Sequence, residues 1–189
     1  MTTGGTAARA LAAVLAAASI AMSGCDEGSG GNTGSEDFDS PIINEDVPRM
    51  DIADLPDIDA THAQMLDLIE RVRAEVSRLV PASAPWEWRR EESQDGCERN
   101  GRKGVTLYFA KLTSSHSFTD QEWNIALPAV QKLAAEAGLT GGAAMQESSG
   151  AHDMRFTSDD GRELVFGSIE ASLITGSIAC RLDAEDKTR

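Results

Sequence analysis

The chain has 189 residues and a formal net charge of −14 at pH 7, with 31 acidic and 17 basic residues. So acidic a chain argues against nucleic acid as a partner, because phosphate binding depends on a surplus of basic groups. The length suits one globular domain with flanking segments.

The first 24 residues predict a secretion signal. Arg9 is the only charged residue among them, and the apolar run of residues 10–22 follows it. This run is too short for the ~20 residues of a membrane-spanning helix, and no second long apolar run occurs later. Met22-Ser23-Gly24 precedes Cys25, and small residues before a cysteine are typical of lipoprotein cleavage sites. We therefore predict that Cys25 becomes lipidated; secretion without lipid and a buried N-terminal helix are the alternatives.

A lipidated Cys25 would hold the protein on the extracytoplasmic face of the cell membrane, since two acyl chains anchor durably where one binds reversibly. Residues 25–59 then form the lipidated N-terminus and a tether. Residues 26–59 carry 11 acidic residues and one basic residue. The Gly, Ser, Asp and Glu of residues 26–46 predict a solvated spacer without a calcium-loop pattern. Residues 47–59 predict a strap that packs on the domain through Val47, Met50, Ile52, Leu55 and Ile58.

Two segments have the apolar spacing of amphipathic helices. The first is 61–80, where Thr61 and Gln64 have capping-box spacing and Pro81 ends the pattern. The second is 119–137, which opens with Thr119 and Glu122 at the same spacing. Pro128 lies inside it, so we expect a kink or two short coaxial pieces.

The remaining segments predict strands. Residues 86–91 and 105–112 are expected to be neighbouring strands, with a polar loop at 95–102. Residues 154–166 predict a hairpin with an Asp-Gly turn, and 171–182 a last strand that is broken or bulged at Gly176. The fold class that follows is α+β, a two-layer sandwich with a largely antiparallel sheet packed by two main helices, in a single domain over residues 60–189.

Three cysteines are an odd number for an exported protein. Lipidation accounts for Cys25, which leaves Cys97 and Cys180 as an even pair in an oxidising compartment. We predict that these two form a disulfide; a catalytic thiol is the alternative and would require a partner histidine.

Several of these features occur together in a known family. They are the lipobox cysteine, a helix beginning near Asp57, the stretch from Trp86 to Cys97, Trp123 ahead of Ala-Leu-Pro-Ala-Val, and the final residues 173–182. Over residues 50–183 the chain resembles the LppA/LppV-type lipoproteins of mycobacteria and related actinobacteria. The resemblance implies a small surface-anchored domain with a disulfide and no assigned reaction, so it supplies no catalytic residue.

The sequence offers little support for catalysis or for metal binding. His62, His116 and His152 are not at metal-ligand spacing, and no zinc-protease or serine-hydrolase motif occurs. The Ser-rich stretch around His116 reads as a polar turn, and the side chains of His152 and Asp153 should diverge on a strand. We therefore predict no catalytic residues, no metal and no cofactor.

Trp86 and Trp88 are the strongest candidates for ligand contact, because strand alternation puts both indoles on one face. They form either part of the core or an exposed platform for a sugar or peptide. The predicted function is a non-enzymatic binding or structural role, with an envelope protein or glycan as partner and no nucleic acid. A carrier of a lipid or other apolar ligand and a hydrolase of envelope polymers are the alternatives.

Overall fold

The computed structural model describes residues 50–187. The predicted signal, Cys25 and most of the predicted tether lie outside the described residues. None of the described helices is long and apolar enough to cross a bilayer. In chain order the elements are α1 (Ile58–Leu79), the 3-10 helix η1 (Pro81–Ser83), β1 (Glu87–Arg89), β2 (Ser93–Arg99), β3 (Arg102–Tyr108), β4 (Lys111–Ser114), α2 (Asp120–Glu136), β5 (Gly141–Ser148), β6 (Ala151–Thr157), β7 (Arg162–Ser168), β8 (Ser172–Arg181) and α3 (Ala184–Lys187).

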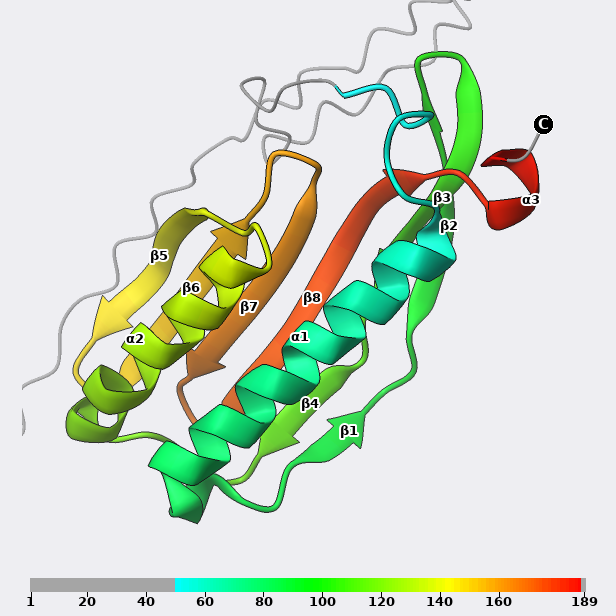
Figure 1. Ribbon diagram of the computed structural model, residues 1–189. Helices are drawn as coiled ribbons and strands as arrows, with labels where there is room; N and C mark the ends of the chain where they lie inside the picture. The colour runs from blue at the N-terminus through cyan, green and yellow to red at the C-terminus, as the bar shows by residue number, and fades with distance from the viewer. Residues whose placement is uncertain (1–49, 188–189) are drawn as a thin grey trace, which may run out of the picture. The chain divides into compact units, whose positions relative to one another are not determined.

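The strands form one antiparallel sheet in the order β1-β4-β8-β7-β6-β5, with β2 paired to β3 and β3 to β8. β3 and β4 lie one after the other along the same side of β8, so the central strand β8 joins both halves of the sheet. Both main helices lie on one face of the sheet (Figure 1). The α+β two-layer architecture expected from the sequence is confirmed.

One apolar cluster lies between the two helices and the sheet. From the helices it includes Met65, Ile69 and Val72 of α1 and Trp123 and Val130 of α2. Its sheet side is formed by buried residues of several strands, namely Leu107, Leu112, Phe156, Leu164, Phe166, Ile174 and Ile178. Along β8 buried and half-buried side chains alternate, as expected of a strand whose one face packs against helices.

The helix boundaries differ in part from the prediction. α1 begins at Ile58, three residues earlier than the capping-box spacing of Thr61 predicts, because the Asp57 carboxylate accepts a hydrogen bond from the Ala60 N–H and caps the helix. The hydroxyl of Thr61 instead donates to the Asp57 carbonyl from inside the first turn. The capping box of Thr119 and Glu122 at the start of α2 is confirmed.

The expected division of the second helix into two pieces is wrong, since α2 continues through Pro128. Proline lacks an N–H, so it removes one hydrogen bond from the helix interior. The buried residues on both sides of it, Trp123 and Ala126 before and Val130 and Ala134 after, belong to the same cluster. Packing against the sheet therefore holds the two halves as one helix.

The strand predictions were incomplete at the first hairpin. The segment expected to be a polar loop is β2 and the start of β3, and the turn is confined to Asn100 and Gly101, both with positive φ. This two-residue turn matches the twist of a hairpin. The strand expected over 105–112 is divided at Phe109 and Ala110, which are both buried. As expected, its second part, β4, is the antiparallel neighbour of β1.

Two further differences concern small residues. β5 was not predicted, since its Gly-Gly-Ala-Ala sequence lacks the branched and aromatic residues typical of strands. β8 is neither broken nor bulged at Gly176, which pairs in regular register with Leu164. A Cβ at Gly176 would lie 2.5 Å from the Glu163 carbonyl oxygen and 3.1 Å from the methyl carbon of Met65. Glycine here permits close packing of α1 on the sheet.

Candidate functional site

The disulfide links the first hairpin to the central strand. Cys97 of β2 and Cys180 of β8 are bonded, with their Cα atoms 5.8 Å apart and a sequence separation of 83. At this point β3 also packs closely on β8, because a Cβ at Gly104 would lie 2.3 Å from the Arg181 carbonyl oxygen. The hairpin is thereby fixed to the sheet at one end of the domain.

The end of the predicted strap packs on the same disulfide. Ile52 is fully buried and forms a second small cluster with Cys180 and Leu182. Leu55 is also buried, and the Lys187 ammonium donates to its carbonyl oxygen. Met50 does not pack as expected, since 41% of it is exposed. The N-terminal end of the described chain is thus attached beside the disulfide.

A buried arginine lies next to the disulfide at this end of the domain. The Arg181 side chain has no exposed surface, and its guanidinium donates to the Asp160 carbonyl oxygen at 2.7 Å and lies 3.4 Å from the Asp160 carboxylate. Burial lowers the pKa of Arg181. Burial raises the pKa of Asp160, but hydrogen bonds from Ser158 and Arg162 and the nearby cations outweigh it, so the pKa of Asp160 is lowered.

These contacts predict that Asp160→Asn destabilises the domain by about 2 kcal/mol at pH 7, because it leaves the Arg181 charge buried without its carboxylate. The folded-state pKa of Asp160 lies below the unfolded one, so the carboxylate's contribution is present above the unfolded pKa and lost as the pH falls through the folded value. Urea unfolding of both proteins should therefore show a difference that shrinks in acid. Asp159→Asn, at an exposed neighbour, should cost less than about 0.5 kcal/mol. Equal losses for the two variants would contradict the role of Asp160.

Each of the three histidines lies within hydrogen-bonding distance of a carboxylate. The Nε2 of His152 lies 3.0 Å from Asp120 at the start of α2, and the imidazole stacks on Trp123 with ring centroids 4.8 Å apart. The Asp120 carboxylate also accepts the Gly150 N–H and the Ser149 hydroxyl, and these bonds, the Gly150 bond foremost, lower the pKa of Asp120. Asp120 thus ties the β5–β6 turn and the start of β6 to the helix.

The other two histidine–carboxylate pairs involve His116 and His62. His116 Nε2 is 3.1 Å from Glu122, whose carboxylate also accepts the Thr119 N–H of the capping box; that hydrogen bond contributes most to the lowered pKa of Glu122. His62 lies 3.1 Å from both carboxylate oxygens of Glu92, and its ring stacks on Phe109.

Among the residues that the structure describes, none of these pairs has the arrangement of a catalytic relay. In such a relay the carboxylate holds one ring nitrogen and the nucleophile lies at the other. Here Ser149 and His152 both bond to Asp120, while the His152 Nδ1 is buried without a partner. Ser172 donates to the backbone carbonyl of His116, not to its ring. Within residues 50–187 no group of three or more His, Cys, Asp or Glu could hold a metal ion.

Trp86 and Trp88 differ in exposure. Trp86 is half-buried, packs against the main cluster and has a buried indole N–H without a hydrogen-bond partner. Trp88 lies in β1 opposite Leu112 and is 42% exposed. Any ligand contact at the predicted platform would therefore be made mainly by Trp88.

A pocket of about 350 Å³ lies where α3 meets the start of α1. It is lined by Asp59, Asp183, Ala184, Glu185 and Asp186. An apolar ligand requires an apolar lining, so this pocket does not suit a lipid. The apolar side chains between sheet and helices pack against one another in the main cluster. These observations do not favour the lipid-carrier alternative.

Comparison with protein families matches residues 45–184 to LppA, described as "Lipoprotein confined to pathogenic Mycobacterium". The chain belongs to the LppA lipoprotein family. This confirms the resemblance inferred from the lipobox, tryptophan and cysteine positions. Curated proteins gave no match.

Two solved structures are similar to the LppA-family domain described above. The lipoprotein LppA from Mycobacterium tuberculosis has 12% identity and a TM-score of 0.53, over 73% of this chain and 85% of that chain. A DUF4853 family protein from Actinomyces odontolyticus ATCC 17982 has 12% identity and a TM-score of 0.46, over 71% of this chain and 74% of that chain. At this identity the first similarity shows a shared fold and nothing about activity.

Proposed function

We propose that the protein is a lipid-anchored component of the cell envelope, held on the extracytoplasmic face of the cell membrane through lipidated Cys25. The Cys97–Cys180 disulfide is the observation that carries this proposal. It leaves Cys25 as the one cysteine outside the bond, directly after Met22-Ser23-Gly24. A structural disulfide also fits an oxidising compartment outside the cytoplasm.

The domain acts by binding another envelope component, not by catalysis. Its histidines and carboxylates are used to fix turns and helix ends, as at His152 and Asp120. The acidic residues 26–46 supply a spacer between membrane and domain, and the exposed Trp88 offers an apolar contact for a protein or glycan partner.

The Cys25→Ala variant tests the anchor. We expect the native chain to sediment with membranes and to enter the detergent phase of a phase-separating detergent, because its acyl chains partition into both. Variant protein of mature size should be absent from both fractions, because it carries no acyl chains, and any uncleaved precursor, which keeps its apolar signal, is recognised by its larger size. Immunoblotting of the fractions measures this distribution.

The Ser23→Ala variant is the matched control, because it keeps a small residue before the cysteine and should be retained like the native chain. Cys25→Ala protein of mature size that still co-sediments with membranes after a high-salt wash, and still enters the detergent phase, would contradict lipid anchoring.

A further inference from the structure

The tip of the β2–β3 hairpin carries basic residues in an otherwise acidic protein. Arg99 and Arg102 face each other as a cross-strand pair beside the Asn100-Gly101 turn, and Lys103 follows. Like charges directly opposite each other destabilise a hairpin. Such a pair is favoured where an anionic partner compensates it.

Nearby carboxylates compensate these cations only in part. Arg102 Nε is 3.8 Å from the Asp51 carboxylate, at the limit of an ion pair. Within residues 50–187 Arg99 and Lys103 have no ion pair, although Glu98 faces Lys103 in the register. By contrast, Arg89, which faces Lys111 in another like-charge pair, forms an ion pair with Glu87.

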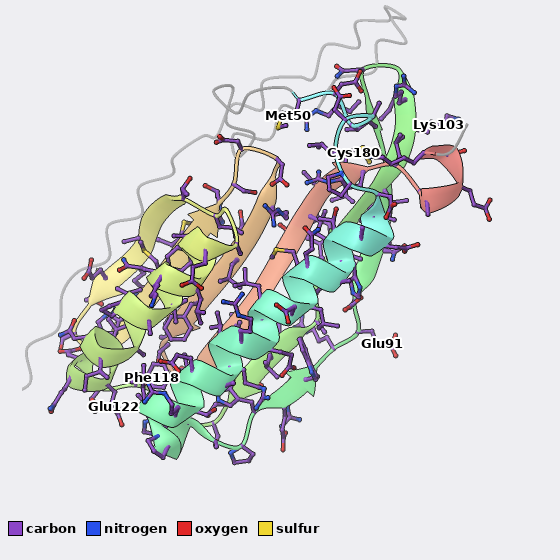
Figure 2. All side chains as sticks on the ribbon, in the orientation of Figure 1. Met50, Glu91, Lys103, Phe118, Glu122 and Cys180 are labelled. Carbon is purple, nitrogen blue, oxygen red and sulfur yellow. A yellow bond between two sulfur atoms is a disulfide. The ribbon has the colours of Figure 1, made fainter. Side chains whose placement is uncertain are left out.

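The hairpin lies at the end of the domain where the described chain begins. Met50, Lys103 and Cys180 lie at one end and Phe118 and Glu122 at the other (Figure 2). The closed end of the hairpin extends beyond α3 and the start of α1 (Figure 1). The disulfide and the close approach at Gly104 hold it in this position.

We infer that this hairpin tip, Arg99, Arg102 and Lys103, contacts the phosphates of anionic lipid headgroups and orients the tethered domain on the membrane. The inference rests on the proposed lipid anchor. Three cations attract an anionic bilayer too weakly to recruit so acidic a protein from solution. A tether raises the effective concentration of the domain at the surface, so the same contacts suffice to select an orientation.

Site-specific fluorescence measures this orientation. Asn100→Cys places a reactive thiol at the tip of the hairpin. It is the one free thiol of the lipidated chain, because Cys25 carries lipid and the other two cysteines are bonded to each other. The full lipidated chain, labelled there with an environment-sensitive dye, is reconstituted in phosphatidylcholine vesicles with and without phosphatidylglycerol. We expect quenching by brominated lipid to be strong only with phosphatidylglycerol, and to decrease with added salt. A label at Glu170→Cys, in the β7–β8 turn, should remain unquenched.

Paired variants identify the charges responsible. Arg102→Gln with Lys103→Gln should reduce the ratio of membrane-contacting to free hairpin about thirtyfold, since each cation near an anionic surface contributes a factor of about five. Arg89→Gln with Lys111→Gln removes the same charge at the other cross-strand pair and should leave the ratio unchanged. Equal quenching in both lipid mixtures, or none in either, would overturn the inference. The absence of quenching in both mixtures would also be observed if the acidic tether covered the hairpin tip, and it overturns the inference in that case too.

A second arm separates this inference from the anchor itself. The Cys25→Ser chain, held to nickel-chelating lipid by an N-terminal histidine tag, should show the same dependence on phosphatidylglycerol. If the native chain fails to float with vesicles of either composition, the proposed anchor fails, and the tagged chain still decides whether the hairpin contacts headgroups.

Discussion

Replacing both Cys97 and Cys180 with alanine is expected to lower the free energy of unfolding by about 4 to 5 kcal/mol. The bond closes a loop with a sequence separation of 83 residues, and constraint of the unfolded chain accounts for a loss of that size. The hairpin and the strap should be affected first, because β2 and Ile52 both pack at this bond. Urea unfolding followed by circular dichroism, with Cys25→Ser in both proteins, measures the loss.

Reduction of the disulfide in the Cys25→Ser chain supplies a matched control, since it should reproduce the alanine variant without any change of core volume. Both should unfold at a midpoint lower by more than 10 °C, on the order expected for a domain of this size. A loss below about 1 kcal/mol in both experiments would show that the bond does not stabilise the fold.

The second large effect is expected for Phe166→Ala in the main cluster. Phe166 is fully buried and stacks on Trp123 with ring centroids 4.8 Å apart. Its ring centroid lies 5.8 Å from that of Phe118. Removing its ring should cost about 3 to 5 kcal/mol, through lost burial and the cavity left behind. Thermal and urea unfolding, compared with the native domain, measure the loss.

Ile125→Ala is the control for this prediction. Ile125 lies on α2 with 46% of its surface exposed, so its truncation should cost less than about 1 kcal/mol. Phe166→Leu, which keeps most of the volume, should fall between the two. If Phe166→Ala were no more destabilising than Ile125→Ala, the cluster would not be the main source of stability.

The sequence predicted the elements whose signals are local. The apolar periodicity of both helices and the Asp-Gly turn of the β6–β7 hairpin sufficed for their identification. β5 was not predicted because its strand conformation depends on pairing with β6, not on its own small residues. Pro128 was misjudged because tertiary packing, which is not visible in the sequence, keeps α2 continuous.

The candidate sites were predictable only in part. An even pair of cysteines led directly to the disulfide, since the predicted export signal implies an oxidising compartment. The hairpin cations were missed because residues 95–102 were expected to be a loop, in which the pairing of Arg99 with Arg102 has no meaning. The Asn100-Gly101 turn signal, had it been weighed against the polar loop, could have revealed them.

Mass spectrometry of the N-terminal tryptic peptide from membrane-extracted protein tests lipid anchoring most directly. The peptide should begin at Cys25, end at Arg49 and carry the added mass of a diacylglyceryl group on the cysteine, with or without a further acyl chain on its amino group. A peptide that begins at another residue, or an unmodified Cys25 in protein taken from the membrane fraction, would contradict the proposed anchor.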